Sequence, residues 1–396
     1  MKKDSKIFIF SMSFFLCFII AIYIHPCSSP LPEENSYPLL YSKQNRDDLE
    51  KIFLRAIDGA KESIMVAVFN LSDGKITQAL KKRAEEGIKV TVIYDKKASK
   101  GISKKLGDKI HLAPRHHKGH MHLKILLIDK KKIWIGSANM TWESLHMHDN
   151  LVVGIQDFKI GEFISEKLQD LIQGKTPKTS EALFNAGKQK IHFFFLPEKK
   201  KSPNEIISLI HNAQKSLIVA MFTWTRMDFA NAVIQASKRG VDIKVFIDSN
   251  SAKGCGKQVV KELSREGIQV NINQGLQLLH HKFLYVDERD LLVGSANWTK
   301  SAFQNNDDCF LILHDLSKEQ KKAMNNTYKI LFLESIEISN DYEKYKSNIE
   351  SCKNKNSQLC CALLANEFSG KRYENSFNRI WKYGEKRRKG GLFKKS

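Results

Sequence analysis

The feature that most constrains the fold is an internal repeat, because two long stretches of the chain carry similar residues in the same order. The segment 60–69 (AKESIMVAVF) recurs as 213–222 (AQKSLIVAMF), and 87–95 (GIKVTVIYD) recurs as 240–248 (GVDIKVFID). Self-similarity over this span indicates one structural unit of about 150 residues that is present twice. The chain must therefore fold into two domains of the same kind.

Each copy shows the same sequence of secondary-structure signals. A helix is expected over 46–60, and its counterpart over 203–214. A short, wholly apolar strand follows in both copies, which is typical of a strand buried on both faces. The next helix has Ser72 as its predicted N-cap and ends at Gly87, with Gly240 in the matching place, and a second apolar strand comes after it.

The strand–helix–strand order predicts an α/β fold, because a helical crossover joins parallel neighbours. We expect two pseudo-symmetric α/β/α sandwich repeats with central, mainly parallel sheets and an active site at the repeat interface. Helices over about 159–173 and 317–334 should close the copies. The predicted parts are an N-terminal segment 1–29, a first repeat 40–173, a linker 174–189, a second repeat 190–335 and a basic C-terminal extension 336–396.

A motif of fixed spacing occurs once in each copy. His122 and Lys124 stand two residues apart, so a strand points both side chains to one face. A polar turn and a returning strand then lead to an asparagine that should lie near them. The motif residues are His122, Lys124, Asp129, Ser137 and Asn139 in the first copy, and His280, Lys282, Asp287, Ser295 and Asn297 in the second.

The residue types in this motif suit a phosphate group. An imidazole can attack phosphorus or move a proton, and Lys and Asn can bind phosphate oxygens. One set is incomplete, because displacement at phosphorus needs a group on each side. Two sets that face each other across a pseudo-two-fold axis supply both groups.

With these paired HxKxxxxD…GSxN motifs, the chain resembles the phospholipase D superfamily over about residues 40–335. The second copy is similar to the mitochondrial cardiolipin hydrolase and bacterial endonuclease members. Those relatives carry one motif and dimerise, so the resemblance implies that this chain works as a monomer. It also implies two-step chemistry through a phosphohistidine, with no metal and no cofactor.

The resemblance also assigns roles to residues. It implies that His122 is the nucleophile and His280 the acid/base, although the sequence itself is nearly symmetric. It implies that Asp129 and Asp287 are mainly structural. The family's glutamate that orients each histidine has Asp149 and Asp307 at the corresponding positions, where a solvated surface acid is the alternative interpretation.

The charge of the chain indicates a polyanionic partner. There are 64 Lys+Arg against 43 Asp+Glu, a formal net charge of +21. An anionic phospholipid surface and a nucleic acid both fit this excess, and the tail 371–396 could dock on either. We expect a hydrolase of the distal phosphodiester of glycerophospholipids. The alternatives are an endonuclease, a phosphatidyltransferase resembling cardiolipin synthase, and an inactive docking module.

The N-terminus predicts attachment to a membrane. A short basic start precedes the apolar stretch 7–24, and no Lys or Arg follows until Lys43. By the positive-inside rule this places the N-terminus in the cytoplasm and the catalytic part on the exported side. We interpret 1–29 as an anchor, or as a signal peptide that is cleaved to give a secreted protein.

Several other residues invite a function and also a plainer interpretation. The histidines at 111, 116, 117, 120, 146 and 148 could bind a metal, or form a phosphate-facing loop with charge from Arg115 and Lys118. Three tryptophans near the predicted site (142, 224 and 298) could contact substrate or belong to the core. His281 and Cys309 are expected to be buried in strands, and the cysteines at 352, 360 and 361 could form a disulfide after export.

Overall fold

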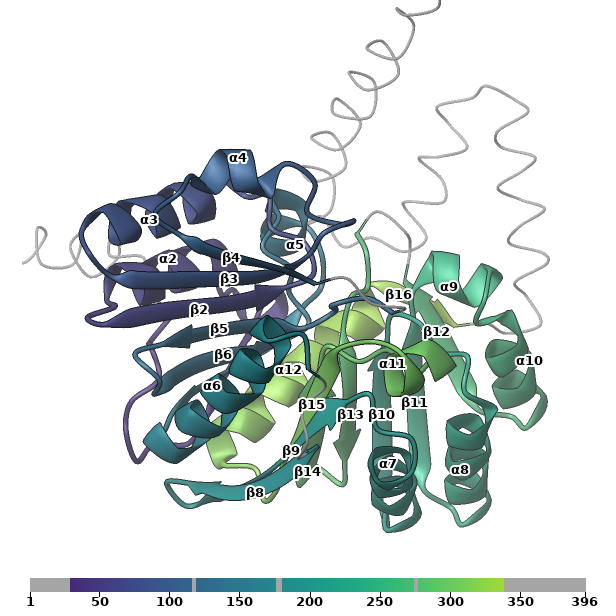
Figure 1. Cartoon of the computed structure of the whole chain (residues 1–396). Coiled ribbons are helices and arrows are strands. Elements are labelled where there is room, and N and C mark those ends of the chain that lie inside the picture. Colours follow the sequence, from purple (N-terminus) through teal and green to yellow (C-terminus); the bar gives the residue numbers. More distant parts are fainter. Residues whose placement is uncertain (1–28, 116–118, 176–179, 274–276, 338–396) are drawn as a thin grey trace, which may run out of the picture. The chain divides into compact units, whose positions relative to one another are not determined.

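Strands and helices follow one another as the repeat predicts (Figure 1). The computed structural model describes residues 29–115, 119–175, 180–273 and 277–337. The first repeat contains β1 (Leu39–Ser42), the 3-10 helix η1 (Lys43–Asn45), α2 (Leu49–Asp58), β2 (Ser63–Val68), α3 (Gly74–Glu85), β3 (Lys89–Asp95), α4 (Ile102–Leu106), β4 (His111–Arg115), β5 (Lys124–Ile128), β6 (Lys132–Gly136), α5 (Trp142–His146), β7 (Leu151–Gln156) and α6 (Phe158–Ile172).

The second repeat follows the same order, but it lacks a counterpart of η1, has two helices in place of α4, and gains two strands. It contains β8 (Glu181–Ala186), β9 (Gln189–Leu196), α7 (Lys201–His211), β10 (Ser216–Met221), α8 (Met227–Lys238), β11 (Asp242–Ile247), α9 (Ser249–Lys253), α10 (Lys257–Arg265), β12 (Gln269–Asn273), β13 (Lys282–Val286), β14 (Asp290–Gly294), α11 (Lys300–Gln304), β15 (Asp308–Leu313), α12 (Lys318–Leu333) and β16 (Ser335–Glu337).

The two sheets share one strand order, which confirms the repeat. The first sheet runs β1-β7-β6-β5-β2-β3-β4, and the second runs β16-β12-β11-β10-β13-β14-β15-β9-β8. When β2 is matched with β10, the middle seven strands of the second sheet reproduce the first sheet. Strands β16 and β8 extend the second sheet at its two edges. The predicted α/β class with two pseudo-symmetric repeats is confirmed.

The prediction that the sheets are mainly parallel is wrong. Among the described strands, parallel pairing is confined to β2-β3-β4 and β10-β11-β12, where helices cross over. The strands that carry the motif, β5 to β7 and β13 to β15, pair antiparallel. A turn of three residues joins β5 to β6, and so short a connection can only reverse the chain.

The segment 174–189 is not a bare linker. Strand β8 lies within it and pairs antiparallel with β9, from Glu181 opposite Phe194 to Ala186 opposite Gln189. The predicted boundary is therefore wrong in this respect, because the residues before 190 already belong to the second sheet. Gly and Thr residues suggested a loop, but the edge of a sheet accepts any strand that can complete its hydrogen bonds.

The predicted helices are present, with one corrected N-cap. Asp73, not Ser72, caps α3, because its Oδ1 accepts a hydrogen bond from the Ile76 amide at 2.9 Å. The Ser72 amide instead donates to the Met140 carbonyl. Gly87 and Gly240 follow α3 and α8 with φ of +92° and +90°, a conformation that favours glycine over residues with a Cβ.

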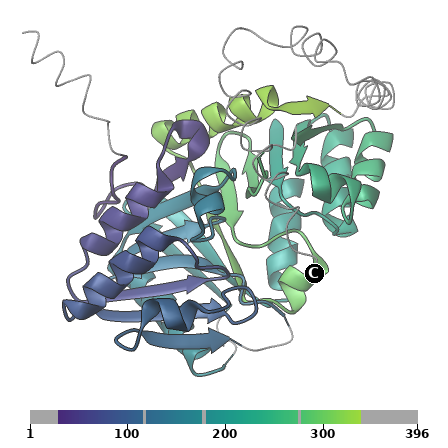
Figure 2. The same cartoon turned by 90° about the horizontal axis from the view of Figure 1, so that it is seen from above.

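Helices α6 and α12 join the two repeats through one hydrophobic core. This core includes Ile164 and Leu168 of α6, Met324 of α12, and strand residues from both sheets. Helix α12 also packs on the start of the first repeat, where the Asn326 side chain donates to the Gln44 carbonyl at 2.8 Å. Figure 2 shows this helix, in yellow-green, beside the purple N-terminal part of the first repeat.

Some predictions fall outside the described residues. None of the helices within the described ranges is long and apolar enough to span a bilayer. The stretch 7–24, the tail 371–396 and the cysteines at 352, 360 and 361 lie outside those ranges. Cys309 is fully buried in β15, as predicted.

Candidate active site

The two motif lysines begin equivalent strands, and each motif histidine stands two residues before its lysine. Lys124 opens β5 and Lys282 opens β13, and both side chains are buried. Each Nζ donates to the carbonyl oxygen of its own histidine, over 2.6 Å to His122 and 2.8 Å to His280. The local backbone thus fixes the two ammonium groups beside the imidazoles.

We call the histidine, lysine and asparagine of one motif a half-site. A phenylalanine packs against the histidine and lysine of each half-site, although the sequence motif does not include it. The Lys124 ammonium lies 5.4 Å from the ring centroid of Phe69, and the Lys282 ammonium lies 4.9 Å from that of Phe222. The same rings contact His122 and His280, with centroids 5.2 and 5.0 Å apart. The signal was present in the sequence, since both residues end the repeated apolar segment.

The residue that orients His122 comes from the second repeat. His122 Nδ1 lies 2.7 Å from Oδ1 of Asp308, which is fully buried. The Ser295 hydroxyl donates to the same oxygen at 2.7 Å, and the Asn306 amide donates to Oδ2. A carboxylate only accepts hydrogen bonds, so Nδ1 carries the proton and Nε2 keeps a lone pair for chemistry.

His280 is oriented in the same way by the first repeat, but by an amide. Its Nδ1 lies 3.0 Å from Oδ1 of Asn150. The Asn150 amide nitrogen donates to the Ser144 carbonyl at 2.8 Å, and the Ser137 hydroxyl donates to Oδ1 at 2.8 Å, which fixes the amide orientation. His280 therefore also carries its proton on Nδ1, but its partner has no charge.

The prediction that Asp149 and Asp307 orient the histidines is wrong by one residue. Their side chains point to the other side of the chain, because successive residues of an extended backbone alternate in direction. Asp307 forms a two-pronged ion pair with Arg115, at 3.0 and 3.1 Å. Asp149 accepts from the Gln44 amide at 2.8 Å and pairs with Lys43 at 3.2 Å.

These two aspartates nevertheless contribute through their backbones. The His122 amide donates to the Asp307 carbonyl at 2.7 Å, and the His280 amide donates to the Asp149 carbonyl at 3.0 Å. These hydrogen bonds belong to isolated parallel bridges that pair Met121 with Asp307 and Leu279 with Asp149. Each histidine is thus held by the opposite repeat at its backbone and at its ring.

Burial and positive charge lower the pKa values of both motif histidines and both motif lysines. Burial lowers the pKa of His122 to about 4, against the opposing effect of Asp308. Burial, then Lys282 and Lys124, lower the pKa of His280 well below its usual value. Burial likewise lowers the pKa of Lys124 to about 7, and the pKa of Lys282 falls with burial and the nearby Lys124.

This charge arrangement suits an anionic ligand. The effects of Lys124 on His280 and Lys282 reach from one repeat to the other, so the two half-sites share one electrostatic environment. A bound anion would favour the protonated form of both lysines, whose ammonium groups otherwise repel each other. Asp308 is the counter-charge nearest His122, and although burial opposes its ionisation, His122 and Lys124 hold its pKa below the usual value.

Asn139 and Asn297 lie in the loops that follow β6 and β14. Their Oδ1 atoms are buried and have no hydrogen-bond partner within the described part of the chain. Thr141 and Thr299, two residues farther on, cap α5 and α11 through their side chains. The caps are thus made by the threonines and not by the two motif asparagines.

Asp129 and Asp287 act far from the histidines, in the turns at the other ends of β5 and β13. Asp129 accepts from the backbone amides of 61–63, and Asp287 from those of 214–216. Both have positive φ, 51° and 52°. The five residues of β5 place Asp129 about 16 Å along the strand from Lys124.

The weaker candidates from the sequence take other places. Arg115 does not supply charge to a phosphate-facing loop, because it is buried against Asp307. Trp224 and Trp298 are core residues in edge-to-face contact, while Trp142 is 47% exposed and stacks on His146. Residues 116–118 lie outside the described ranges. Within those ranges no group of three or more His, Cys, Asp or Glu side chains could hold a metal.

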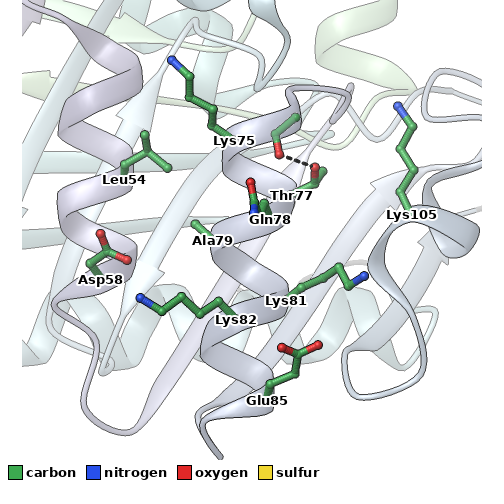
Figure 3. A pocket seen from close by; sticks show the side chains of 11 residues that line it. Leu54, Asp58, Lys75, Thr77, Gln78, Ala79, Lys81, Lys82, Glu85 and Lys105 are labelled. Carbon is green, nitrogen blue, oxygen red and sulfur yellow. Dashed lines mark hydrogen bonds between the residues drawn. The ribbon is translucent and has the colours of Figure 1, made fainter.

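A separate groove of about 820 Å³ lies between α2, α3 and α4. Lysines 75, 81, 82 and 105 line it together with Asp58 and Glu85 (Figure 3). Its walls contain none of the motif residues. Lys75 is already paired with Glu50 at 2.6 Å, and the groove is distinct from the histidine site.

Comparison with known proteins agrees with this geometry. The family model described as "Cardiolipin synthase, PLD-like domain" matches residues 53–172 and 206–330. The mitochondrial cardiolipin hydrolase of Mus musculus is 34% identical over 142 residues, which cover 36% of this chain and 59% of that protein. The phospholipase D of Rickettsia prowazekii (strain Madrid E) is 33% identical over 137 residues, covering 34% of this chain and 64% of that protein.

A solved structure shares the fold across most of the chain. The phosphatidylserine synthase of Haemophilus influenzae Rd KW20 aligns with a TM-score of 0.59 and 14% identity, covering 78% of this chain and 89% of that one. Two family domains are thus present in one chain, each with its own histidine motif. The chain belongs to the phospholipase D-like family. It is an enzyme of that superfamily.

Proposed function

We propose that this protein hydrolyses the distal phosphodiester of glycerophospholipids in two steps, through a phosphohistidine on His122. The observation that carries the proposal is the unequal support of the two histidines. Attack by Nε2 of His122 on phosphorus places positive charge on the imidazole, and the Asp308 carboxylate at Nδ1 stabilises that charge. Asn150 offers His280 no such charge, so a proton on Nε2 of His280 is readily given away.

Bonds and protons balance in both steps. In the first, the bond from His122 Nε2 to phosphorus forms, the bond to the leaving oxygen breaks, and His280 protonates that oxygen. In the second, His280 takes a proton from water, the water oxygen attacks phosphorus, and the nitrogen–phosphorus bond breaks. Lys124, Lys282 and the two motif asparagines stabilise the charge on the other phosphate oxygens.

Two observations favour a lipid substrate. The relatives at 34% and 33% identity are named for cardiolipin and phospholipid cleavage. Trp142 and Met147 are exposed on and just after α5, only a few residues beyond Asn139, where apolar side chains could enter a lipid surface. Because both half-sites belong to one chain, we propose that a monomer is active, with the stretch 7–24 holding it at an exported membrane face.

A nuclease is the second candidate, and a basic segment favours it. The segment 96–109 follows β3, whose last residue Asp95 lies 3.5 Å from His120. It contains six exposed lysines (96, 97, 100, 104, 105 and 109). A nucleic-acid backbone could follow such a segment. A phosphatidyltransferase would use the same covalent intermediate with an alcohol in place of water.

The test offers the full-length protein phosphatidylcholine and cardiolipin vesicles, and single- and double-stranded nucleic acid, all in EDTA. We expect headgroup release that His122→Ala abolishes. Faster cleavage of nucleic acid would favour a nuclease. Transfer of the phosphatidyl group to added glycerol would favour a phosphatidyltransferase. Equal rates in the parent and His122→Ala would exclude the mechanism.

Labelling of the enzyme separates the roles of the two histidines. With a radiolabelled diester that has an aryl leaving group, His280→Ala should accumulate a covalent, acid-labile label, and His122→Ala should acquire none. The reverse pattern would exchange the roles.

A further inference from the structure

His148 stands beside the catalytic His280 and takes part in no contact that accounts for its presence there. Its ring centroid lies 6.0 Å from that of His280, at 48° between the planes. Its backbone is held by the Glu143 carbonyl at 2.9 Å. Its side chain is half-buried and has no hydrogen-bond partner among the residues that the structure describes.

The second repeat has no counterpart to this imidazole. The equivalent residue is Asn306, which is buried and fully engaged. It accepts from the His120 amide at 3.1 Å and donates to Asp308 at 3.2 Å. The structural requirement at this position is therefore met by an asparagine, and the histidine occurs only on the side of His280.

His280 needs a source of protons, because its resting proton is on Nδ1 and its Nε2 must gain a second proton before it can protonate the leaving oxygen. It is 5% exposed, and its Nδ1 is occupied by Asn150. His148 lies closer to solvent, and a separation of 6.0 Å between ring centroids can be bridged by one hydrogen-bonded water. The charged groups that act on His148 are Glu143, which favours its protonation, and Lys282 and Lys43, which oppose it.

We propose that His148 relays protons between solvent and His280. In the first step a proton passes from His148 to Nε2 of His280, which then gives it to the leaving oxygen and is neutral again. In the second step the proton that His280 takes from water returns to His148 and then to solvent. This inference rests on the proposed phosphodiesterase activity, with His280 as the acid/base. It predicts that His148 matters most when the leaving oxygen needs a proton.

The test compares His148→Asn, the residue of the second repeat, with His146→Asn as a matched control two residues earlier, at the end of α5. His146 stacks on Trp142 and lies 3.7 Å from Glu50, outside the site. Each full-length variant is mixed rapidly with two soluble diesters. One has an alkyl leaving group that must be protonated, and the other has a 4-nitrophenyl leaving group that need not be.

We expect His148→Asn to slow the first step with the alkyl diester by about 10- to 100-fold, and with the nitrophenyl diester by about twofold at most. The pH profile with the alkyl diester should change, and added imidazole should restore part of the rate to His148→Ala. His146→Asn should match the parent in each assay.

Two results would overturn the relay. An equal loss with both diesters, without imidazole rescue, would mean that His148 only holds the site together. Unchanged rates would mean that it has no part in the reaction. In either case a loss of activity in His122→Ala would leave the proposed function standing, whereas a parent enzyme that cleaves neither diester would remove both proposals.

Discussion

His122 and Asp308 are 186 positions apart in the chain, and yet Nδ1 of one lies 2.7 Å from Oδ1 of the other. The reciprocal contact joins His280 to Asn150 at 3.0 Å. Each repeat therefore supplies the histidine of one half-site and the orienting group of the other. Neither repeat contains a complete half-site, which gives a physical reason for both to be present in one chain.

The carboxylate of Asp308 should be essential for the rate. Asp308→Asn keeps an oxygen near His122 but removes the negative charge that stabilises the imidazole during attack. We expect kcat to fall by about 100- to 10,000-fold with little change in KM. Steady-state hydrolysis of a soluble diester measures this. A loss below threefold would contradict the role of the charge.

A carboxylate in place of the amide that orients His280 should raise the pKa of His280. Asn150→Asp places a negative charge 3.0 Å from His280 Nδ1, which raises the pKa of that imidazole from its depressed value. The protonated form then persists to higher pH, so the optimum of kcat/KM should move upward. A pH–rate profile checks the direction, and a downward shift would contradict it.

The ion pair between Arg115 and Asp307 should be a major source of stability. Arg115→Met removes the guanidinium that forms two hydrogen bonds with the buried Asp307 carboxylate, and we expect the free energy of unfolding to fall by about 3–5 kcal/mol. Arg115→Met with Asp307→Asn should recover part of this loss. Arg265→Met is the control, because the Arg265 side chain is 64% exposed and its pair with Glu262 should be worth less than about 1 kcal/mol. Denaturant unfolding measures all three.

The buried imidazole of His281 should lower the free energy of unfolding, most of all at acidic pH. His281 is fully buried immediately before β13. Neither of its ring nitrogens has a hydrogen-bond partner within the described ranges. Its counterpart in the first repeat is Leu123. We expect His281→Leu to raise the free energy of unfolding by about 1–3 kcal/mol.

The sign of the pH effect follows from the pKa of His281, which burial lowers to about 3. The unfolded state takes up the proton near pH 6.5, so the native parent loses stability as pH falls from about 6.5 toward 3. The advantage of His281→Leu should therefore grow in acid. The exposed His211→Gln is the control, and thermal melts from pH 7 to pH 5 measure the difference.

Asp129 and Asp287 should support the fold without taking part in the chemistry. Asp287→Ala removes the acceptor of backbone amides in the turn after β13. We expect a loss of about 1–3 kcal/mol in stability, and kcat of the folded enzyme within about threefold of the parent. Asp129→Ala should behave alike. A loss of kcat in a fully folded variant would contradict a structural role.

The sequence contained enough to predict the helices, the apolar strands and the motif residues, because these depend on short-range periodicity. It could not decide between neighbouring residues at the orienting positions. Asp149 and Asp307 were predicted because they stand at the positions that correspond to the family's glutamate, whereas Asn150 and Asp308 face the histidines. A shift of one residue along an extended backbone reverses the side that a side chain faces.

By itself the sequence determined that there are two alike domains, and which histidines, lysines and asparagines form the candidate site. Only the tertiary structure decided the antiparallel direction of the motif strands, the place of β8 in the second sheet, and the exchange of orienting groups between repeats. Spacing along a chain determines the local conformation and which side chains share a face of a helix or strand. Contacts between residues nearly 200 positions apart depend on how whole sheets and helices pack, and no local pattern records that packing.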